Sequence, residues 1–491
     1  MGFNREINRL LIGLLLLFGI VAMSAAYWAV TGADTILQRD DNPRRVEAER
    51  AIRRGELLDR NGVLLASSEG EGEVTREYFQ PSMYSALGYY SFRYGVSGIE
   101  SAYNDLLRGD DLVRSAGDVL LGGLMHRPQV GSDARLTLDL DVQQAVADAL
   151  EGHTGAVVVI GVPDGEVLAM VSRPAYDPNR FAGRIRSKDW KEIIENPDKP
   201  LLNRAIQSRL APGSTFKPVM ALAGLEQGIA GSDFRVHCSG GASFYGRYFA
   251  CHKKGGHGTV DLNRAIALSC DVYFYTVGQR MGIETMASFA HQFGLGEETG
   301  IELPSERIGI VPSEAWKRKA KNEPWLPGET ISASIGQGYV NVTPLQMASL
   351  IGTVANDGAM FRPRLVQAVM NRATGELQRR PAVLKRTLNL RPGILPVIKD
   401  ALAGVVKEGT ATKAQSALVT IAGKTGTAQM TALRTGPEKD IPKKFRDHAW
   451  FVAFAPVEAP TIAVAVLGEH MGHGGSASAP LAKELIETYV K

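Results

Sequence analysis

Residues 211–222 read APGSTFKPVMAL, and this stretch decides how the centre of the chain folds. Pro218 would break the interior of a helix, but it is tolerated in a first turn, whose N–H groups have no intrahelical acceptor. We therefore expect a helix that begins close to Ser214 and places the hydroxyl where free N–H groups favour negative charge. Lys217 shares a helix face with Ser214 and can take its proton. The alternative is a capping serine followed by a solvated lysine.

A second polar segment, residues 269–271, reads SCD and is followed by a helical pattern. A serine two residues before a carboxylate can send both polar groups into one cleft. Ser269 and Asp271 are therefore candidate partners of the first pair. The alternative is an ordinary helix N-cap, a role in which serine and aspartate are both common.

A third segment, residues 423–429, reads GKTGTAQ and is typical of a strand with small residues on one side. Lys424 supplies a cation, Gly426 lets another backbone approach, and Thr425 and Thr427 point to one face. This arrangement suits a peptide that adds to the strand edge, with its carboxylate held by lysine and threonine. The alternative, a nucleotide phosphate loop, fails because the position that needs its first glycine is a leucine.

The strand patterns pair as hairpins. Residues 156–160 and 167–171 flank a Pro-Asp-Gly turn, and residues 450–455 and 462–467 flank a second turn. Helices that interrupt such hairpins favour an α/β (α+β) fold, an antiparallel sheet flanked by helices, over a doubly wound parallel sheet. The helical patterns cover residues 214–227, 261–281, 343–356 and 392–406.

The N-terminal segment is strongly apolar. Residues 10–30 contain no charged side chain, and 21 residues are enough for a helix to cross a bilayer. A cleaved signal peptide is the alternative, but its apolar core is usually shorter, at about 7–15 residues. Arg5 and Arg9 precede the span, so we expect the N-terminus in the cytoplasm and the rest of the chain outside.

Composition excludes other classes of protein. The chain has 491 residues, 55 Lys and Arg against 52 Asp and Glu, and a net charge of +3. That balance gives no field for a phosphate backbone, so nucleic acid is not an expected partner. Average hydrophobic content excludes both wholesale disorder and a polytopic membrane protein.

The three cysteines are too few for a disulfide framework. Cys238 and Cys251 are 13 residues apart, and outside the cytoplasm we expect a disulfide between them. Free thiols are the first alternative, and a metal site with the nearby histidines is the second. Cys270 is then left as a buried, inert thiol.

The order Ser-x-x-Lys, Ser-x-Asp, Lys-Thr-Gly resembles that of penicillin-binding proteins. The chain is most similar to the class B, monofunctional type, and within it to the penicillin-binding protein A type. Further segments fit this resemblance: RGELLDRNG (54–62), GIE (98–100), LNRA (202–205), GQG (336–338), TPLQ (343–346) and GTA (409–411).

The resemblance implies a role for each candidate residue. Ser214 would attack the carbonyl between two terminal D-alanines, with Lys217 as its base. Ser269 would pass a proton to the leaving amine, and Asp271 would hydrogen-bond Lys217. Lys424, Thr425 and Thr427, in a motif completed by Gly426, would hold the substrate carboxylate. The N–H groups of Ser214 and Thr427 would form the oxyanion hole.

The resemblance also implies three units: an anchor (1–30), a small strand-rich pedestal, or dimerisation-like, module (31–135), and a transpeptidase domain (136–491) built on a five-stranded antiparallel sheet. It implies no cofactor. The expected partners are peptidoglycan stem peptides, β-lactams, the bilayer and a membrane-embedded polymerase of lipid-linked disaccharides (SEDS type). The expected location is the bacterial cytoplasmic membrane.

One residue departs from the commoner family pattern. Asn is usual at position 271, and the Asp271 carboxylate adds a charge that favours the protonated form of Lys217. We interpret it as the mark of a subtype that keeps its activity. Alternatives for the whole protein are a D,D-carboxypeptidase, a β-lactamase-like hydrolase, or a scaffold of the wall-synthesis complex whose catalysis is dispensable.

Overall fold

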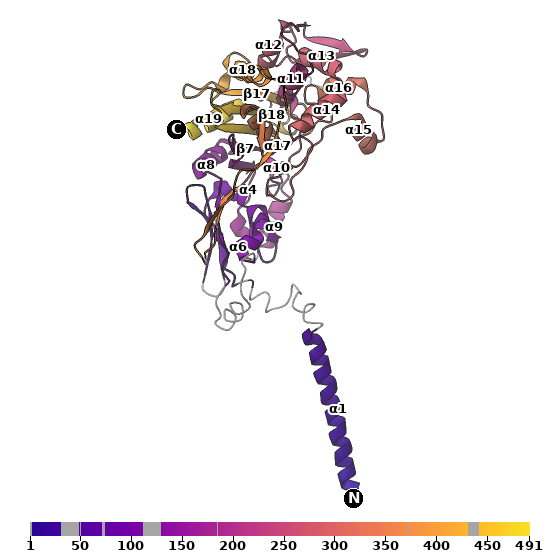
Figure 1. The fold of residues 1–491 in the computed structure, drawn as a ribbon, viewed down its shortest axis with the longest axis vertical. Helices are drawn as coiled ribbons and strands as arrows, with labels where there is room; N and C mark the ends of the chain where they lie inside the picture. The colour runs from indigo at the N-terminus through magenta and orange to yellow at the C-terminus, as the bar shows by residue number, and fades with distance from the viewer. Residues whose placement is uncertain are drawn as a thin grey trace.

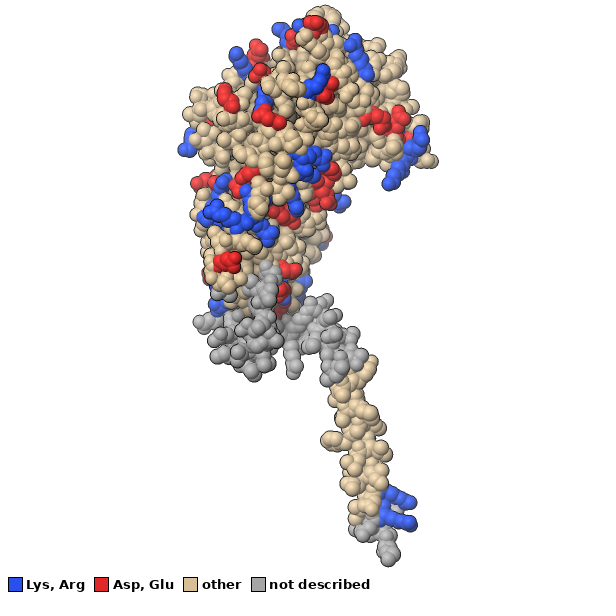
Figure 2. Space-filling view, viewed as in Figure 1, with Lys and Arg blue, Asp and Glu red and all other residues tan. Residues whose placement is uncertain are grey.

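The computed structural model describes residues 2–30, 49, 51–70, 74–110, 129–183, 185–372, 374–430 and 441–491. Parts of the predicted pedestal, residues 31–48 and 111–128, lie outside the described residues. Figure 2 shows acidic and basic side chains interspersed on the face that it draws, in keeping with the near-neutral net charge.

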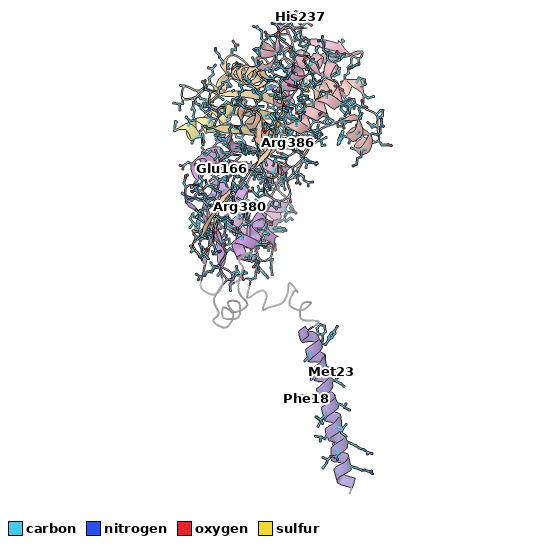
Figure 3. All side chains as sticks on the ribbon, in the orientation of Figure 1. Phe18, Met23, Glu166, His237, Arg380 and Arg386 are labelled. Carbon is cyan, nitrogen blue, oxygen red and sulfur yellow. The ribbon has the colours of Figure 1, made fainter. Side chains whose placement is uncertain are left out.

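The first helix, α1 (Gly2–Val30), is long and apolar (Figure 1). Its segment Ile7–Trp28 has 22 residues and a mean hydropathy of 2.4, and none of it is buried in protein. Side chains such as Phe18 and Met23 project outward from the helix (Figure 3). Apolar side chains without protein neighbours are consistent with the predicted single-pass membrane anchor.

The sheet nearest the N-terminus has six strands in the order β15-β14-β6-β1-β2-β3. β1 runs parallel to β6, and the other neighbours are antiparallel. Two of its strands come from residues 366–379, inside the predicted transpeptidase domain, so this sheet contains strands from both sides of the predicted boundary at residue 135. The strands are β1 (Leu57–Leu58), β2 (Leu64–Glu69), β3 (Thr75–Tyr78), β6 (Asp133–Leu136), β14 (Val366–Met370) and β15 (Leu377–Arg379).

This N-terminal region buries a group of charged side chains, Arg54, Arg76 and Glu100, which we call the arginine cluster. Arg54 Nη2 lies 2.7 Å from Glu100 Oε2, and Arg76 Nε lies 2.7 Å from Glu100 Oε1. The Tyr78 hydroxyl donates to Glu100 Oε1 at 3.2 Å. Burial raises the pKa of Glu100, but the two arginines outweigh it, so the pKa lies below its ordinary value. The carboxylate is therefore held ionised inside the fold.

The second large sheet has five antiparallel strands in the order β17-β18-β19-β7-β8, as predicted. Every residue of its inner strands β18, β19 and β7 is buried, so helices or loops cover both faces. Both predicted hairpins are confirmed, β7 with β8 and β18 with β19. The strands are β7 (Gly155–Gly161), β8 (Val167–Arg173), β17 (Ala422–Ala428), β18 (His448–Ala455) and β19 (Ile462–Gly468).

Helices pack against this sheet from different directions (Figure 1). α17 (Pro344–Ala355) contacts β19, β7 and β18, whereas α19 (Ser478–Val490) contacts β18 and β19, and α8 (Leu140–Ala149) contacts β8. α18 (Ile394–Lys407) contacts β17 and α11 (Lys217–Glu226). The helices thus fix the position of β17 at the edge of the sheet.

The predicted helix over residues 261–281 is wrong in one respect, because it is two helices, α12 (Leu262–Ala267) and α13 (Asp271–Met281). Ser269, in the break, has a φ of 55°, a left-handed conformation that costs a non-glycine residue energy and ends a helix. The apolar pattern continues through the break, so periodicity alone does not reveal it.

The remaining described elements are short. They are η1 (Pro81–Met83), α4 (Tyr84–Leu87), β4 (Tyr90–Ser91), β5 (Gly95–Val96), α5 (Gly98–Ala102), α6 (Asn104–Arg108), η2 (Pro178–Phe181), α9 (Ser187–Ile194), α10 (Arg204–Gln207), η3 (Gly213–Phe216), β9 (Val236–Cys238), β10 (Gly241–Phe244), β11 (Arg247–Ala250), β12 (Gly258–Val260), α14 (Ile283–Gln292), α15 (Glu314–Lys321), α16 (Pro327–Ala333), β13 (Ala359–Phe361), β16 (Leu384–Thr387), η4 (Thr412–Ala414) and η6 (Lys443–Phe445).

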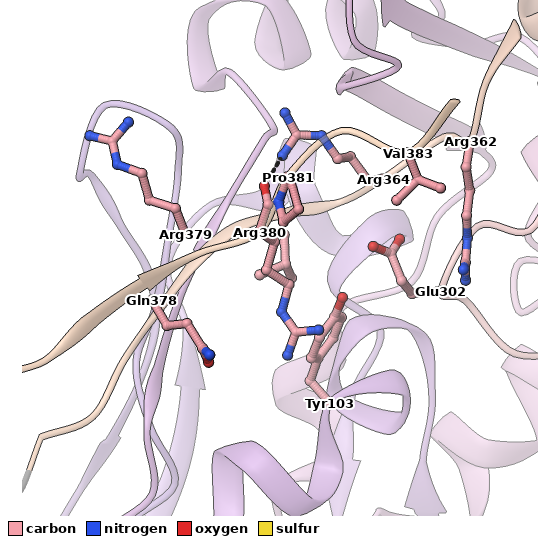
Figure 4. A pocket seen from close by; sticks show the side chains of 10 residues that line it. Tyr103, Glu302, Arg362, Arg364, Gln378, Arg379, Arg380, Pro381 and Val383 are labelled. Carbon is pink, nitrogen blue, oxygen red and sulfur yellow. Dashed lines mark hydrogen bonds between the residues drawn. The ribbon is translucent and has the colours of Figure 1, made fainter. Parts of the chain in front are cut away.

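Ion pairs between charged side chains connect the regions of the two sheets. Glu166, in the β7–β8 hairpin, accepts from Arg364 Nη2 at 2.8 Å and from Arg60 Nη2 at 3.3 Å. Beside it lies a cavity of about 470 Å³ whose wall includes Arg380 and Tyr103 (Figure 4). Its lining shares no residue with the candidate site described below.

Candidate active site

Ser214 lies in η3, directly before α11, so the prediction that a helix begins near it is confirmed. Pro218 occupies the first turn of α11, as expected. Gly213 has a φ of 55°, and a Cβ there would lie 2.5 Å from the carbonyl oxygen of Thr427. Only glycine allows this approach, which brings the Ser214 segment against β17.

Lys217 is fully buried and donates three hydrogen bonds. Its Nζ lies 2.8 Å from the Ser269 carbonyl oxygen, 3.1 Å from Ser269 Oγ and 2.7 Å from Asp271 Oδ1. An ammonium group has three N–H donors, so this set uses all of them. Lys217 must therefore give up a bond before it can face the Ser214 hydroxyl.

Ser269 connects two lysines. Its Oγ lies 3.1 Å from Lys217 Nζ and 2.9 Å from Lys424 Nζ. The strained φ in the break before α13 points the side chain into this gap rather than along a helix. A single hydroxyl thus forms a path for a proton between two amines. We call Lys217, Ser269, Asp271 and Lys424 the lysine cluster.

Lys424 extends from β17 and is also fully buried. Burial, and then the charge of Lys217, lower the pKa of Lys424 well below its ordinary value. Its Nζ also donates to the carbonyl oxygen of Thr425, at 3.2 Å. Lys424 can consequently be a neutral amine inside the site.

Asp271 is the carboxylate of the cluster. Its Oδ1 accepts from Lys217, and its Oδ2 accepts from the backbone N–H of His252 at 2.8 Å. Burial raises the pKa of Asp271, but the charge of Lys217 and the hydrogen bond from the His252 imidazole lower it by more, so the pKa lies below its ordinary value. The carboxylate is therefore ionised at neutral pH.

β17 is the first strand of the sheet, so none of the described strands pairs with its outer edge. The Thr427 carbonyl accepts from Gln337 Nε2 at 2.9 Å, away from β18. The N–H and C=O of one residue in an antiparallel strand point to the same side. The Thr427 N–H consequently faces the Ser214 segment, where an extended peptide could lie along the edge.

The two threonines of the KTG segment each contact a residue from another loop. Thr425 Oγ1 is 2.6 Å from Thr410 Oγ1, and Thr427 Oγ1 is 3.5 Å from His473 Nδ1. A Cβ on Gly426 would lie 2.6 Å from the Pro212 carbonyl oxygen, so only glycine fits between β17 and η3. All eight candidate residues thus belong to one region, and their chemical roles remain predictions.

Four residues of this region were not predicted as part of it: His252, Gln337, Thr410 and His473. Each comes from a loop that lies 15 to 90 residues from its partner, so the sequence next to the partner does not mark it. Thr410 and Gln337 do stand in segments that fit the family resemblance, GTA and GQG, which is the one signal available.

The predicted disulfide between Cys238 and Cys251 is not formed, and this expectation is corrected. All three cysteines are buried free thiols. The sulfurs of Cys238 and Cys251 both approach Nδ1 of His257, at 3.6 and 3.5 Å. The hairpins that carry them direct both sulfurs toward the imidazole.

Two family models match the chain. Residues 155–487 match the penicillin binding protein transpeptidase domain, and residues 54–131 match the penicillin binding protein A dimerisation domain. The peptidoglycan D,D-transpeptidase MrdA of Acinetobacter baumannii is 38% identical over 408 residues, 81% of this chain and 60% of that protein. The chain thus spans less than two thirds of the length of MrdA. PbpA of Mycobacterium tuberculosis, also a peptidoglycan D,D-transpeptidase, is 31% identical and matches 99% of this chain and 98% of its own.

Solved structures agree with these matches. Pseudomonas aeruginosa PBP2 in complex with WCK 5153 has a TM-score of 0.77 at 34% identity, covering 89% of this chain and 96% of that one. The ceftriaxone acyl-enzyme of penicillin-binding protein A from M. tuberculosis has a TM-score of 0.78 at 29% identity, covering 90% and 100%. Helicobacter pylori PBP2, in complex with MreC, has a TM-score of 0.75 at 26% identity, covering 89% and 97%.

Proposed function

Because the chain belongs to the penicillin-binding protein transpeptidase family, we propose that it is a membrane-anchored peptidoglycan D,D-transpeptidase. Ser214 is the nucleophile, and D-alanyl-D-alanine stem peptides and β-lactams acylate it. The observation that carries this proposal is the lysine cluster, in which one serine hydroxyl joins two buried lysines beside the Ser214 helix.

Activation of Ser214 requires Lys217 without its proton. The proton passes through Ser269 Oγ to Lys424, whose lowered pKa means that it can start as the neutral amine. This exchange leaves the total charge of the cluster unchanged. A substrate carboxylate held by Lys424, Thr425 and Thr427 stabilises the ammonium at Lys424, so binding of the correct substrate itself favours the active protonation state.

In the acylation step, residues of the site account for every bond and for the proton that moves. Ser214 Oγ forms a bond to the carbonyl carbon between the two terminal D-alanines, and Lys217 takes the serine proton. The developing oxyanion is stabilised by the N–H groups of Ser214 and Thr427, a contribution of about 2.7–4 kcal/mol per donor in other enzymes. As the C–N bond breaks, the proton returns through Ser269 to the departing D-alanine amine.

A second stem peptide completes the reaction. Its amine attacks the Ser214 ester, forms the cross-link and restores the serine hydroxyl. A β-lactam follows the first half of the same route, and its ring opening leaves an acyl group on Ser214. The acyl-enzyme structures of penicillin-binding protein A from M. tuberculosis, named for ceftriaxone and imipenem, support this expectation.

The proposal also covers the orientation of the chain in the membrane and its protein partners. Arg5 and Arg9, at the N-terminal end of α1, favour a cytoplasmic N-terminus and an extracytoplasmic catalytic domain. The complex of H. pylori PBP2 with MreC supports assembly of this chain with other wall-synthesis proteins. We propose a membrane-embedded SEDS-type polymerase of lipid-linked disaccharides as one of them.

The test is labelling of the detergent-solubilised full chain with a fluorescent penicillin. Wild type is expected to form a long-lived covalent adduct, and Ser214→Ala is expected to form none. Ser232→Ala removes an exposed serine and serves as the matched control. Labelling of Ser214→Ala at the wild-type rate would overturn the proposal, and rapid turnover of the antibiotic would assign a hydrolase instead. Complementation of a depleted strain by Ser214→Ala would assign a scaffold.

A further inference from the structure

The cavity of about 470 Å³ beside Arg380 lies between the N-terminal region and the transpeptidase domain, and arginines dominate its wall (Figure 4). Tyr103, from the N-terminal region, forms one part of the wall, and Glu302 with residues from 362–366 and 378–383 forms the rest. The proposed transpeptidation uses none of these residues. Any ligand of this cavity is therefore distinct from the substrate at Ser214.

One strongly basic segment supplies most of the wall. Residues 362–391 contain eight lysines and arginines and one acidic residue, Glu376. Five of the eight pair with carboxylates from other segments. The other three, Arg362, Arg379 and Arg380, all line the cavity and form no ion pair with any residue that the structure describes. The unpaired charge of the segment is thus gathered at one place.

A fourth arginine of the wall, Arg364, is already neutralised. Its Nη2 lies 2.8 Å from Glu166 Oε1 and 3.3 Å from Asp164 Oδ2. Glu302 is the one carboxylate among the lining residues, and its Oε2 accepts from the Leu365 N–H at 3.1 Å. A guanidinium keeps its proton at any ordinary pH, so three unpaired groups against one carboxylate leave a surplus of about two positive charges.

Contacts on both sides of the cavity hold the arginines in place. The Arg380 carbonyl accepts from Arg364 Nη1 at 2.8 Å, and the Arg380 guanidinium lies over the Tyr103 ring, with Cζ 5.7 Å from the ring centre (Figure 4). On the other side, Arg362 Nε donates to the Gly300 carbonyl. Groups that are positioned before a ligand arrives lower the entropic cost of binding it.

This arrangement favours a phosphate over a single carboxylate. A carboxylate is planar and pairs with one guanidinium fork, whereas phosphate oxygens point in several directions and can accept from groups on different segments. A phosphate monoester carries a charge of about −1.5 to −2 near neutral pH, which matches the surplus. Much of the remaining wall, Val366, Gln378, Pro381 and Val383, is uncharged, and the volume leaves room for a small organic group on the phosphate.

We propose that this cavity binds a phosphate monoester, with Arg362, Arg379 and Arg380 as donors to the phosphate oxygens. The same chemistry occurs in a soluble ester and in the headgroup of phosphatidic acid. Because the wall combines Tyr103 of the N-terminal region with residues of the transpeptidase domain, the bound ester holds the two regions together. The proposal does not depend on the function proposed for Ser214.

Isothermal titration calorimetry of the detergent-solubilised full chain with glycerol 3-phosphate tests the binding. Wild type is expected to bind one equivalent, whereas glycerol, which lacks the phosphate, is expected not to bind. Arg362→Gln and Arg380→Gln should each weaken binding about 10- to 100-fold, because each removes a charged donor. Arg247→Gln removes an exposed arginine outside the cavity and should bind as wild type does. Ser214→Ala should also bind as wild type does, which separates this site from catalysis.

Two further measurements complete the test. Glycerol 3-phosphate should raise the unfolding temperature of wild type and leave that of Arg380→Gln unchanged, since a ligand stabilises only the fold that binds it. In nanodiscs, weaker binding of glycerol 3-phosphate with phosphatidic acid than with phosphatidylcholine would assign a lipid headgroup as the occupant, and equal binding would assign a soluble ester. Absence of binding to wild type, wild-type affinity in both arginine variants, or equally tight binding of succinate would overturn the proposal.

Discussion

The arginine cluster and the lysine cluster both bury two basic side chains around one carboxylate, but they differ in whether a basic side chain can lose its proton. In the arginine cluster both cations contact Glu100 directly, and a guanidinium keeps its proton at any ordinary pH. In the lysine cluster only Lys217 contacts Asp271, whereas Lys424 contacts Ser269. A buried amine can lose its proton, so a proton can move between the side chains of the lysine cluster. The charges of the arginine cluster stay fixed.

The largest effect is expected when the lysine cluster is given the chemistry of the arginine cluster. Lys217→Arg keeps the charge beside Asp271 but cannot accept the serine proton, so the rate of penicillin acylation should fall about 100- to 10,000-fold. Stopped-flow labelling with a fluorescent penicillin measures it. Arg76→Lys is the matched control in the other cluster and should acylate at the wild-type rate. Equal rates for Lys217→Arg and wild type would remove Lys217 from the proposed mechanism.

An effect of similar size, but on stability, follows from removing the charge that balances the arginines. Glu100→Gln leaves two buried guanidinium groups without a carboxylate, which should lower the free energy of unfolding by about 3–5 kcal/mol. Denaturant unfolding monitored by fluorescence measures the change. The acylation rate per folded molecule should stay at the wild-type value, since Glu100 lies in the other region. Loss of acylation in the folded variant would show that the two clusters are coupled.

The difference in stability between wild type and Glu100→Gln should depend on pH. The pKa of Glu100 is lowered in the fold, so its contribution to stability is fully present above the unfolded value of about 4.5 and is lost as the pH falls through the lower folded value. The stability difference between wild type and Glu100→Gln should therefore be constant at neutral pH and shrink in acid. A difference that grows in acid would contradict the assignment.

The smallest effect is expected at the carboxylate of the lysine cluster. Asp271→Asn keeps an oxygen that can accept from Lys217 but removes the charge that favours its protonated form. Acylation by penicillin should persist within about tenfold of the wild-type rate, a change of about 1.4 kcal/mol. Ser232→Ala again serves as the control. Complete loss of labelling would show that the carboxylate is indispensable and not the mark of a subtype.

Local chemistry explains which features could be predicted. A proline that forces a first turn fixes the start of a helix near Ser214, and a Pro-Asp-Gly turn fixes the β7–β8 hairpin, because each operates within a few residues. The break at Ser269 could not be predicted, since the apolar pattern passes through it. The contacts of His252 and His473 are set by loops that only the tertiary fold brings to the site.

Cysteine spacing was the weakest guide. A separation of 13 residues between Cys238 and Cys251 is compatible with a bond, with free thiols or with shared ligation. In the structure all three cysteines are free thiols, and the pairing of β9 with β12 brings His257 to both sulfurs. No periodicity within the segment encodes that pairing.

The passage of residues 366–379 through the N-terminal sheet also bears on how such a chain can change over time. β14 lies between β6 and β15, so the sheet is complete only when distant parts of the gene are present together. Recombination that exchanged the first 135 codons with those of a relative would pair strands from one protein with β14 and β15 from another. The two regions are therefore expected to be inherited as one piece.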